Sequence, residues 1–151
     1  MGQSLGITSS VNQAPALSAS EASIYVRFKD KYDREKRVQC HIQATNKFPS
    51  KLGLIIERAE TTAAKKSGGA GDTHLKTISN PKFMMPRTFT IGEVLAVLRT
   101  RLDLTREEGL VLFANEKYML RPNSKLEDVY ARYKDEDGFL YLVYAEENIY
   151  G

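Results

Sequence analysis

The residues best placed for chemistry lie at the end of the chain, where a short tail follows a strand-like run. The run Phe139–Tyr144 is apolar, and the tail after it finishes at Gly151. Glycine has no Cβ, so its carboxylate can enter a narrow channel and its activated carbonyl can be attacked by an amine without steric hindrance. Because glycine makes up about 7% of residues in ordinary proteins, the last residue alone carries little weight.

Side chains suited to conventional catalysis are sparse. Cys40 is the only cysteine, and His41 and His74 are the only histidines. We find no nucleophile–histidine–acid pattern and no dinucleotide-binding glycine pattern, and the glycine-rich stretch Ala63–Gly71 lacks the P-loop spacing. One cysteine and two histidines also disfavour a structural zinc site. The sequence therefore predicts neither an enzyme nor a bound cofactor or metal.

Length and composition favour one globular domain. A chain of 151 residues has room for a single core, and no apolar run approaches the roughly 20 residues that a membrane-spanning helix needs. Residues 1–20 carry no charge, so they lack the basic start of a secretory signal. We expect a disordered leader at 1–23 and a domain at 24–151, with a flexible loop at about 61–76.

Four runs are typical of β-strands, and they are Leu52–Arg58, Lys82–Met85, Leu110–Ala114 and Phe139–Tyr144. The unbroken Leu54-Ile55-Ile56 run suits a central strand that is covered on both faces. A charged segment, Phe28–Lys47, is compatible with helix.

Two capping boxes predict where further helices begin. Thr90 and Glu93 form the first box, and the apolar residues after Thr90 recur at helical spacing, namely Ile91, Val94, Leu95, Leu98 and Leu102. Ser124 and Glu127 open a shorter helix whose apolar face is Leu126, Val129, Tyr130 and Tyr133. Mixed strands around one main helix indicate an α+β fold, with the ubiquitin-like β-grasp as the natural candidate.

Several separate stretches, in the right order, resemble the autophagy ubiquitin-like modifiers. This family comprises the microtubule-associated protein light chains and the GABA-receptor-associated proteins, and the light-chain branch is the more similar. The similarity runs from about Phe28 to Gly151. The stretches that carry it are Phe28–Val38, Lys47–Lys51, Ile55–Ala59, Lys82–Pro86, Leu98–Leu102, Tyr133–Tyr141 and the tail to Tyr150-Gly151. The resemblance implies a β-grasp core with two additional N-terminal helices.

The resemblance also implies a substrate of a ligation cascade. Activating and conjugating enzymes would join the Gly151 carbonyl to the amine of phosphatidylethanolamine, and a deconjugating cysteine protease would reverse the step. Such a protein is cytoplasmic, and it lies on the autophagosome membrane once lipidated. The sequence does not separate a chain that needs no processing from one already cut to its mature length.

Members of this family bind cargo receptors through motifs of the form aromatic-x-x-aliphatic, which add a strand to a sheet edge. By resemblance, the edge is Lys82–Met85, and Lys29 and Lys31 face acidic flanks of the peptide. The aromatic pocket maps to Cys40, Ala44, Gly53, Ile55, Lys82, Met84 and Phe139. The aliphatic pocket maps to Phe83, Met85, Pro86, Phe89, Val94, Val97 and Arg101.

The chain departs from the family pattern around the aromatic pocket. Cys40 stands where an acidic residue is usual, and Ala44 and Gly53 replace Ile and Pro. We expect these smaller residues to enlarge and loosen the pocket. Ser79–Lys82 carries less positive charge than the family stretch, and Pro81 lacks a backbone donor. Since donors alternate along a strand, Pro81 should face the inner strand and leave Lys82 and Met84 free for ligand.

Other interpretations remain open at this stage. Many of the mapped residues suit an ordinary core, and Cys40 suits a passive helix position. The basic face Lys29–Arg37 allows a nucleic-acid-binding module, but it lacks aromatic residues placed for base stacking, so no nucleic acid is expected. A third interpretation is a non-lipidated adaptor of the same fold, which binds peptide motifs or microtubule-associated partners.

Overall fold

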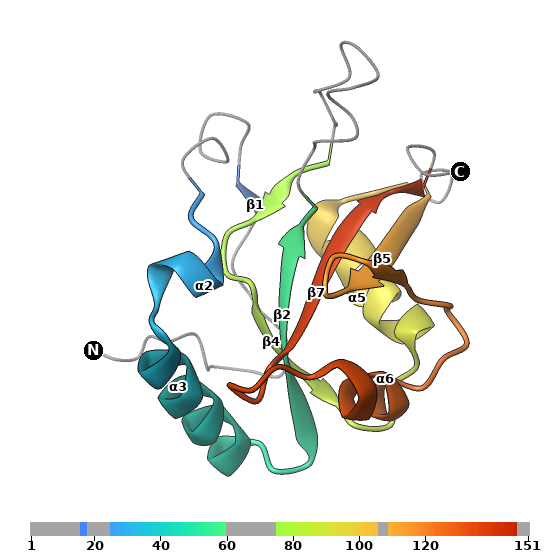
Figure 1. Ribbon diagram of the computed structural model, residues 1–151. Helices are drawn as coiled ribbons and strands as arrows, with labels where there is room; N and C mark the ends of the chain where they lie inside the picture. The colour runs from blue at the N-terminus through green and yellow to red at the C-terminus, as the bar shows by residue number, and fades with distance from the viewer. Residues whose placement is uncertain (1–15, 18–24, 60–74, 106–108, 148–151) are drawn as a thin grey trace.

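The computed structural model describes residues 16–17, 25–59, 75–105 and 109–147. Its centre is a five-stranded mixed sheet in the order β4-β2-β7-β5-β6 (Figure 1). The strands are β2 (Lys51–Arg58), β4 (Lys82–Pro86), β5 (Leu110–Ala114), β6 (Tyr118–Met119) and β7 (Leu140–Glu146). The helices are α2 (Phe28–Lys31), α3 (Arg34–Lys47), α5 (Ile91–Leu102) and α6 (Leu126–Tyr133). The α+β prediction is confirmed.

The register of the sheet makes β4 an edge strand. β2 pairs antiparallel with β4 on one side and parallel with β7 on the other. Leu54, Ile55 and Ile56 of β2 are fully buried, which confirms a central strand covered on both faces. β5 joins β7 antiparallel, and the short β6, which we did not predict, closes the far side.

Alternate side chains of β2 enter two different cores, because successive residues of a strand point to opposite faces. Leu54 and Ile56 belong to the larger core, which includes the apolar faces predicted for α5 and α6. Ile55 belongs to a smaller cluster with Phe28 of α2 and Cys40 of α3. Figure 1 shows α2 and α3 beside β2 and β4, with α5 behind β5 and β7.

The capping predictions had opposite outcomes. Thr90 accepts the Glu93 amide while the Glu93 carboxylate accepts the Thr90 amide, so the first box forms. The box at Ser124 is wrong, because α6 is capped by Lys125 and no side chain bonds its first amides. The Leu126 amide instead donates to the Phe89 carbonyl at 2.9 Å, a backbone contact across the fold.

The predicted leader and loop are wrong at their margins. Within the leader, β1 (Ala16–Leu17) pairs antiparallel with β3 (Thr77–Ile78). Within the predicted loop, Leu75 is buried in the larger core. Lys76 is described too, and its carbonyl accepts a hydrogen bond from the Tyr144 hydroxyl at 2.6 Å. Residues 1–15, 18–23 and 61–74 lie outside the described residues.

The charged segment Phe28–Lys47, predicted to be compatible with helix, forms two helices, α2 and α3. The second helix, α3, begins directly after Asp33, because the Asp33 side chain accepts a hydrogen bond from the Lys36 amide at 2.9 Å and caps the helix. Two helices ahead of the sheet confirm the predicted N-terminal addition. No helix in the described ranges is long and apolar enough to cross a bilayer.

Candidate functional site

The outer edge of β4 is the first component of the predicted groove. On the inner side, the Pro81 carbonyl accepts the Ile56 amide at 2.9 Å, and the Arg87 amide donates to the Ser50 carbonyl at 3.3 Å. Because hydrogen-bonding direction alternates along an antiparallel strand, the backbone groups of Lys82 and Met84 face outward. The prediction that Pro81 faces the inner strand is confirmed.

The expectation that both outward amides are free is wrong for Lys82. Its amide donates to the Asn80 side-chain oxygen at 3.2 Å, a local turn that caps the start of the edge. For the Met84 amide, the described part of the chain offers no outer partner. An incoming strand would therefore find its main backbone contacts at Met84.

The residues of the predicted aromatic pocket are all buried. Exposed fractions are Cys40 7%, Ala44 0%, Ile55 0%, Lys82 5%, Met84 3% and Phe139 0%, and Gly53 is buried as well. Cys40, Ile55 and Phe139 form one cluster with Phe28. Lys82 reaches this cluster through Nζ, which donates to Cys40 Sγ at 3.3 Å.

The Phe139 ring occupies the space that Gly53 leaves. A Cβ built on Gly53 would lie 3.0 Å from that ring and 3.3 Å from the His41 ring. His41 packs edge-on against Phe139, with ring centroids 5.0 Å apart. The expectation of an enlarged, loose pocket is therefore wrong for the ligand-free protein, because neighbouring rings fill the volume that the small residues release.

A buried carboxylate holds Phe139 in place. The Asp137 side chain is fully buried, and it accepts the Phe139 amide at 2.9 Å and the Tyr141 hydroxyl at 2.5 Å. The Arg37 guanidinium of α3 donates to the same carboxylate at 2.7 Å. Burial and this carboxylate raise the pKa of the Tyr141 phenol well above its usual range. These contacts, the Asp137 clamp, fix α3 against the start of β7, beside the residues predicted to form the aromatic pocket.

The predicted aliphatic pocket divides into a core and a rim. Phe83, Met85 and Val94 belong to the larger core. Phe89 and Val97 are half-buried and pack against it. Pro86 and Arg101 are also half-buried, and burial lowers the pKa of the Arg101 guanidinium. On this side of β4, a ligand side chain could reach the four half-buried residues without disturbing the core.

Lys29 lies away from the β4 edge. Its Nζ donates to Asp135 at 2.8 Å and stands 4.5 Å from the centroid of the Tyr141 ring, on the β7 side of β2. Burial opposes ionisation of Asp135, but the hydrogen bonds from Lys29 and from the Asp137 amide lower its pKa overall. Lys31 is exposed, with Nζ 5.6 Å from the centroid of the Tyr32 ring. Contact of either lysine with an acidic peptide flank stays a prediction.

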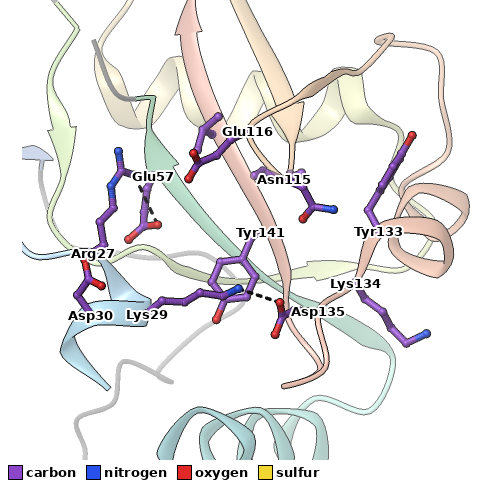
Figure 2. A pocket seen from close by; sticks show the side chains of 12 residues that line it. Arg27, Lys29, Asp30, Glu57, Asn115, Glu116, Tyr133, Lys134, Asp135 and Tyr141 are labelled. Atoms are coloured by element: carbon purple, nitrogen blue, oxygen red, sulfur yellow. Dashed lines mark hydrogen bonds and ion pairs between the residues drawn. The ribbon is translucent and has the colours of Figure 1, made fainter. Parts of the chain in front are cut away.

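A separate cavity of about 530 Å³ lies beside Lys29, and its wall carries charges of both signs (Figure 2). Of the residues mapped from the sequence, only Lys29 lines it. Figure 2 shows Arg27 beside Glu57 and Lys29 reaching toward Asp135. Glu57 is buried and accepts the Tyr25 hydroxyl and the Phe28 amide, each at 2.8 Å, so it ties α2 to β2.

Sequence reasoning missed Glu57, Arg37 and Asp137 as positioning residues. Asp137 and Arg37 are 100 positions apart, and no linear pattern links them. The described ranges hold no group of three His, Cys, Asp or Glu side chains that could bind a metal. Gly151, the predicted conjugation residue, lies outside the described residues.

Comparison with known proteins places this geometry in a family. The family model described as "Autophagy protein Atg8 ubiquitin like" matches residues 35–151. The chain belongs to the Atg8 family. Its members are ubiquitin-like modifiers of autophagy rather than enzymes, which confirms the resemblance seen in the sequence.

Individual relatives agree with this assignment. Autophagy-related protein 8 of Pichia angusta is 31% identical over 126 residues, covering 83% of this chain and 90% of the relative. Human microtubule-associated protein 1 light chain 3 gamma is 30% identical over 105 residues, covering 70% of this chain and 65% of the relative. The crystal structure of Trypanosoma brucei ATG8 superposes with a TM-score of 0.69 at 28% identity, covering 81% of this chain and 95% of that one.

Proposed function

We propose that this Atg8-family protein is joined through Gly151 to phosphatidylethanolamine on autophagosomal membranes. Family membership over residues 35–151, up to and including Gly151, is the observation that carries the proposal. Activating and conjugating enzymes would supply the acyl transfer, and a deconjugating cysteine protease would release the protein. The chain's own contribution is a terminal residue without a Cβ, which leaves the carbonyl open to the lipid amine.

A flotation experiment tests this proposal. The protein is incubated with activating enzyme, conjugating enzyme, ATP and phosphatidylethanolamine liposomes, and the liposomes are then floated on a density gradient. We expect the wild-type protein to float with them and Gly151→Ala to stay at the bottom. If neither protein floats although a known family member does in parallel, the non-lipidated adaptor is favoured instead.

We also propose that cargo receptors bind by adding a strand to β4, with side chains on both sides of that strand. The support is the outward backbone of Met84, the edge position of β4 in the described sheet, and the half-buried rim formed by Pro86, Phe89, Val97 and Arg101. The aromatic side is closed in the ligand-free protein, so ligand binding must move side chains there.

An NMR titration checks this groove. A peptide of the form aromatic-x-x-Leu should shift the amide signals of Lys82, Met84 and Phe139. The same peptide with alanine at both anchor positions should leave them in place. A folded protein whose three signals do not move with the first peptide would contradict the groove.

A further inference from the structure

Lys82 is a buried cation with only a weak partner. Its residue is 5% exposed, and within the described ranges the sole hydrogen-bond partner of its ammonium is Cys40 Sγ at 3.3 Å. A thiol is a weak acceptor, whereas the ammonium has three donors. Burial of an ammonium without a charged partner is costly. A ligand that brings a better acceptor would relieve this cost.

The surroundings of that ammonium are apolar and aromatic. Lys82 lies directly opposite Ile55 in the β2–β4 register, so both side chains point to the same face. Ile55 packs with Phe139 and Phe28 in the smaller cluster. The site therefore has an apolar, aromatic wall with one ammonium at its edge.

The entry of a ligand ring must disturb the contact between Lys82 and Cys40. All the lining residues are buried in the ligand-free protein, and Phe139 is fixed from behind by the Asp137 clamp. The lysine side chain is the long, flexible member of the set, and among the described residues its ammonium is held only by the hydrogen bond to the Cys40 thiol. It is therefore the group that can move most easily when a ring enters.

We propose that this pocket selects a tyrosine at the aromatic position of the bound peptide. The tyrosine ring would pack on Ile55 and Phe139. Its phenolic oxygen would accept a hydrogen bond from the Lys82 ammonium, replacing the Cys40 thiol as acceptor. Phenylalanine brings no acceptor, and the indole N–H of tryptophan is a donor that would face another donor. This inference rests on the proposed peptide groove and names Lys82 as its specificity-determining residue.

The test compares labelled peptides X-x-x-Leu with neutral flanks, where X is Tyr, Phe, Trp or Glu, by fluorescence polarisation with the full chain. A hydrogen bond to a charged group predicts that Tyr binds about tenfold more tightly than Phe. Tyr should also bind more tightly than Trp and Glu. Lys82→Met should bring the Tyr and Phe affinities to within about twofold of each other, since no ammonium is left to satisfy.

Two further variants keep the proposal falsifiable. Lys36→Met removes an exposed lysine of α3, and it should leave the Tyr preference unchanged. Cys40→Asp gives the Lys82 ammonium a resident carboxylate, and it should shrink the preference even if Lys82→Met fails to fold. If all four peptides bind, and the Phe, Trp or Glu peptide binds as tightly as the Tyr peptide or more tightly, only the tyrosine inference is overturned. If none of the peptides binds, the proposed groove is overturned as well.

Discussion

Asp137→Ala is expected to lower the free energy of unfolding by about 3–5 kcal/mol. The substitution leaves the Arg37 side chain, only 13% exposed, without its partner at 2.7 Å and with the more distant Asp135 carboxylate at 4.0 Å. The loss of one member of a buried ion pair typically costs that much. It also removes the acceptor of the Phe139 amide and of the Tyr141 hydroxyl. Urea unfolding followed by circular dichroism measures the change.

The neighbouring residue provides a matched control. Glu136 pairs with Arg34 at 3.2 Å, but their side chains are 79% and 66% exposed. Glu136→Ala should therefore change the stability by less than about 0.5 kcal/mol. Equal effects of the two substitutions would contradict the role assigned to Asp137.

Gly138→Ala is expected to destabilise the protein by about 4 kcal/mol, from backbone strain and steric overlap together. Gly138 has φ of +102°, a conformation that side chains disfavour. A Cβ there would overlap the His41 ring of α3, whose Nδ1 would lie 2.3 Å away. The residue ends the Asp135–Gly138 turn, so the backbone cannot easily shift.

A double-mutant cycle separates the two causes. In a His41→Ala background the ring is absent, so Gly138→Ala should cost about 2 kcal/mol less than in the wild type, while the strain from φ stays. If the cost is the same in both backgrounds, the close approach of α3 to this turn is not what requires glycine.

Elements specified by local chemistry could be predicted from the sequence. The Thr90 capping box and the apolar spacing of α5 define that helix without help from the rest of the fold, and Leu54-Ile55-Ile56 marked the covered central strand. The box at Ser124 failed because a backbone contact from Phe89 took its place. The two-residue strands β1, β3 and β6 exist only because of their partners, so no local pattern reveals them.

The candidate site could be predicted only in outline. Resemblance identified the edge strand and most of the residues beside it. It did not predict that Lys82 would bond Cys40, or that Phe139 would fill the space above Gly53. Both results depend on side chains brought together from distant segments. The Asp137 clamp was missed for the same reason.

The most direct test of the central claim is the intact mass of the protein recovered from liposomes after the conjugation reaction. We predict a gain of one phosphatidylethanolamine minus one water, located by fragmentation on the peptide that ends in Gly151. Treatment with the deconjugating protease should restore the original mass. An unchanged mass, or a lipid attached to an internal side chain, would contradict the account.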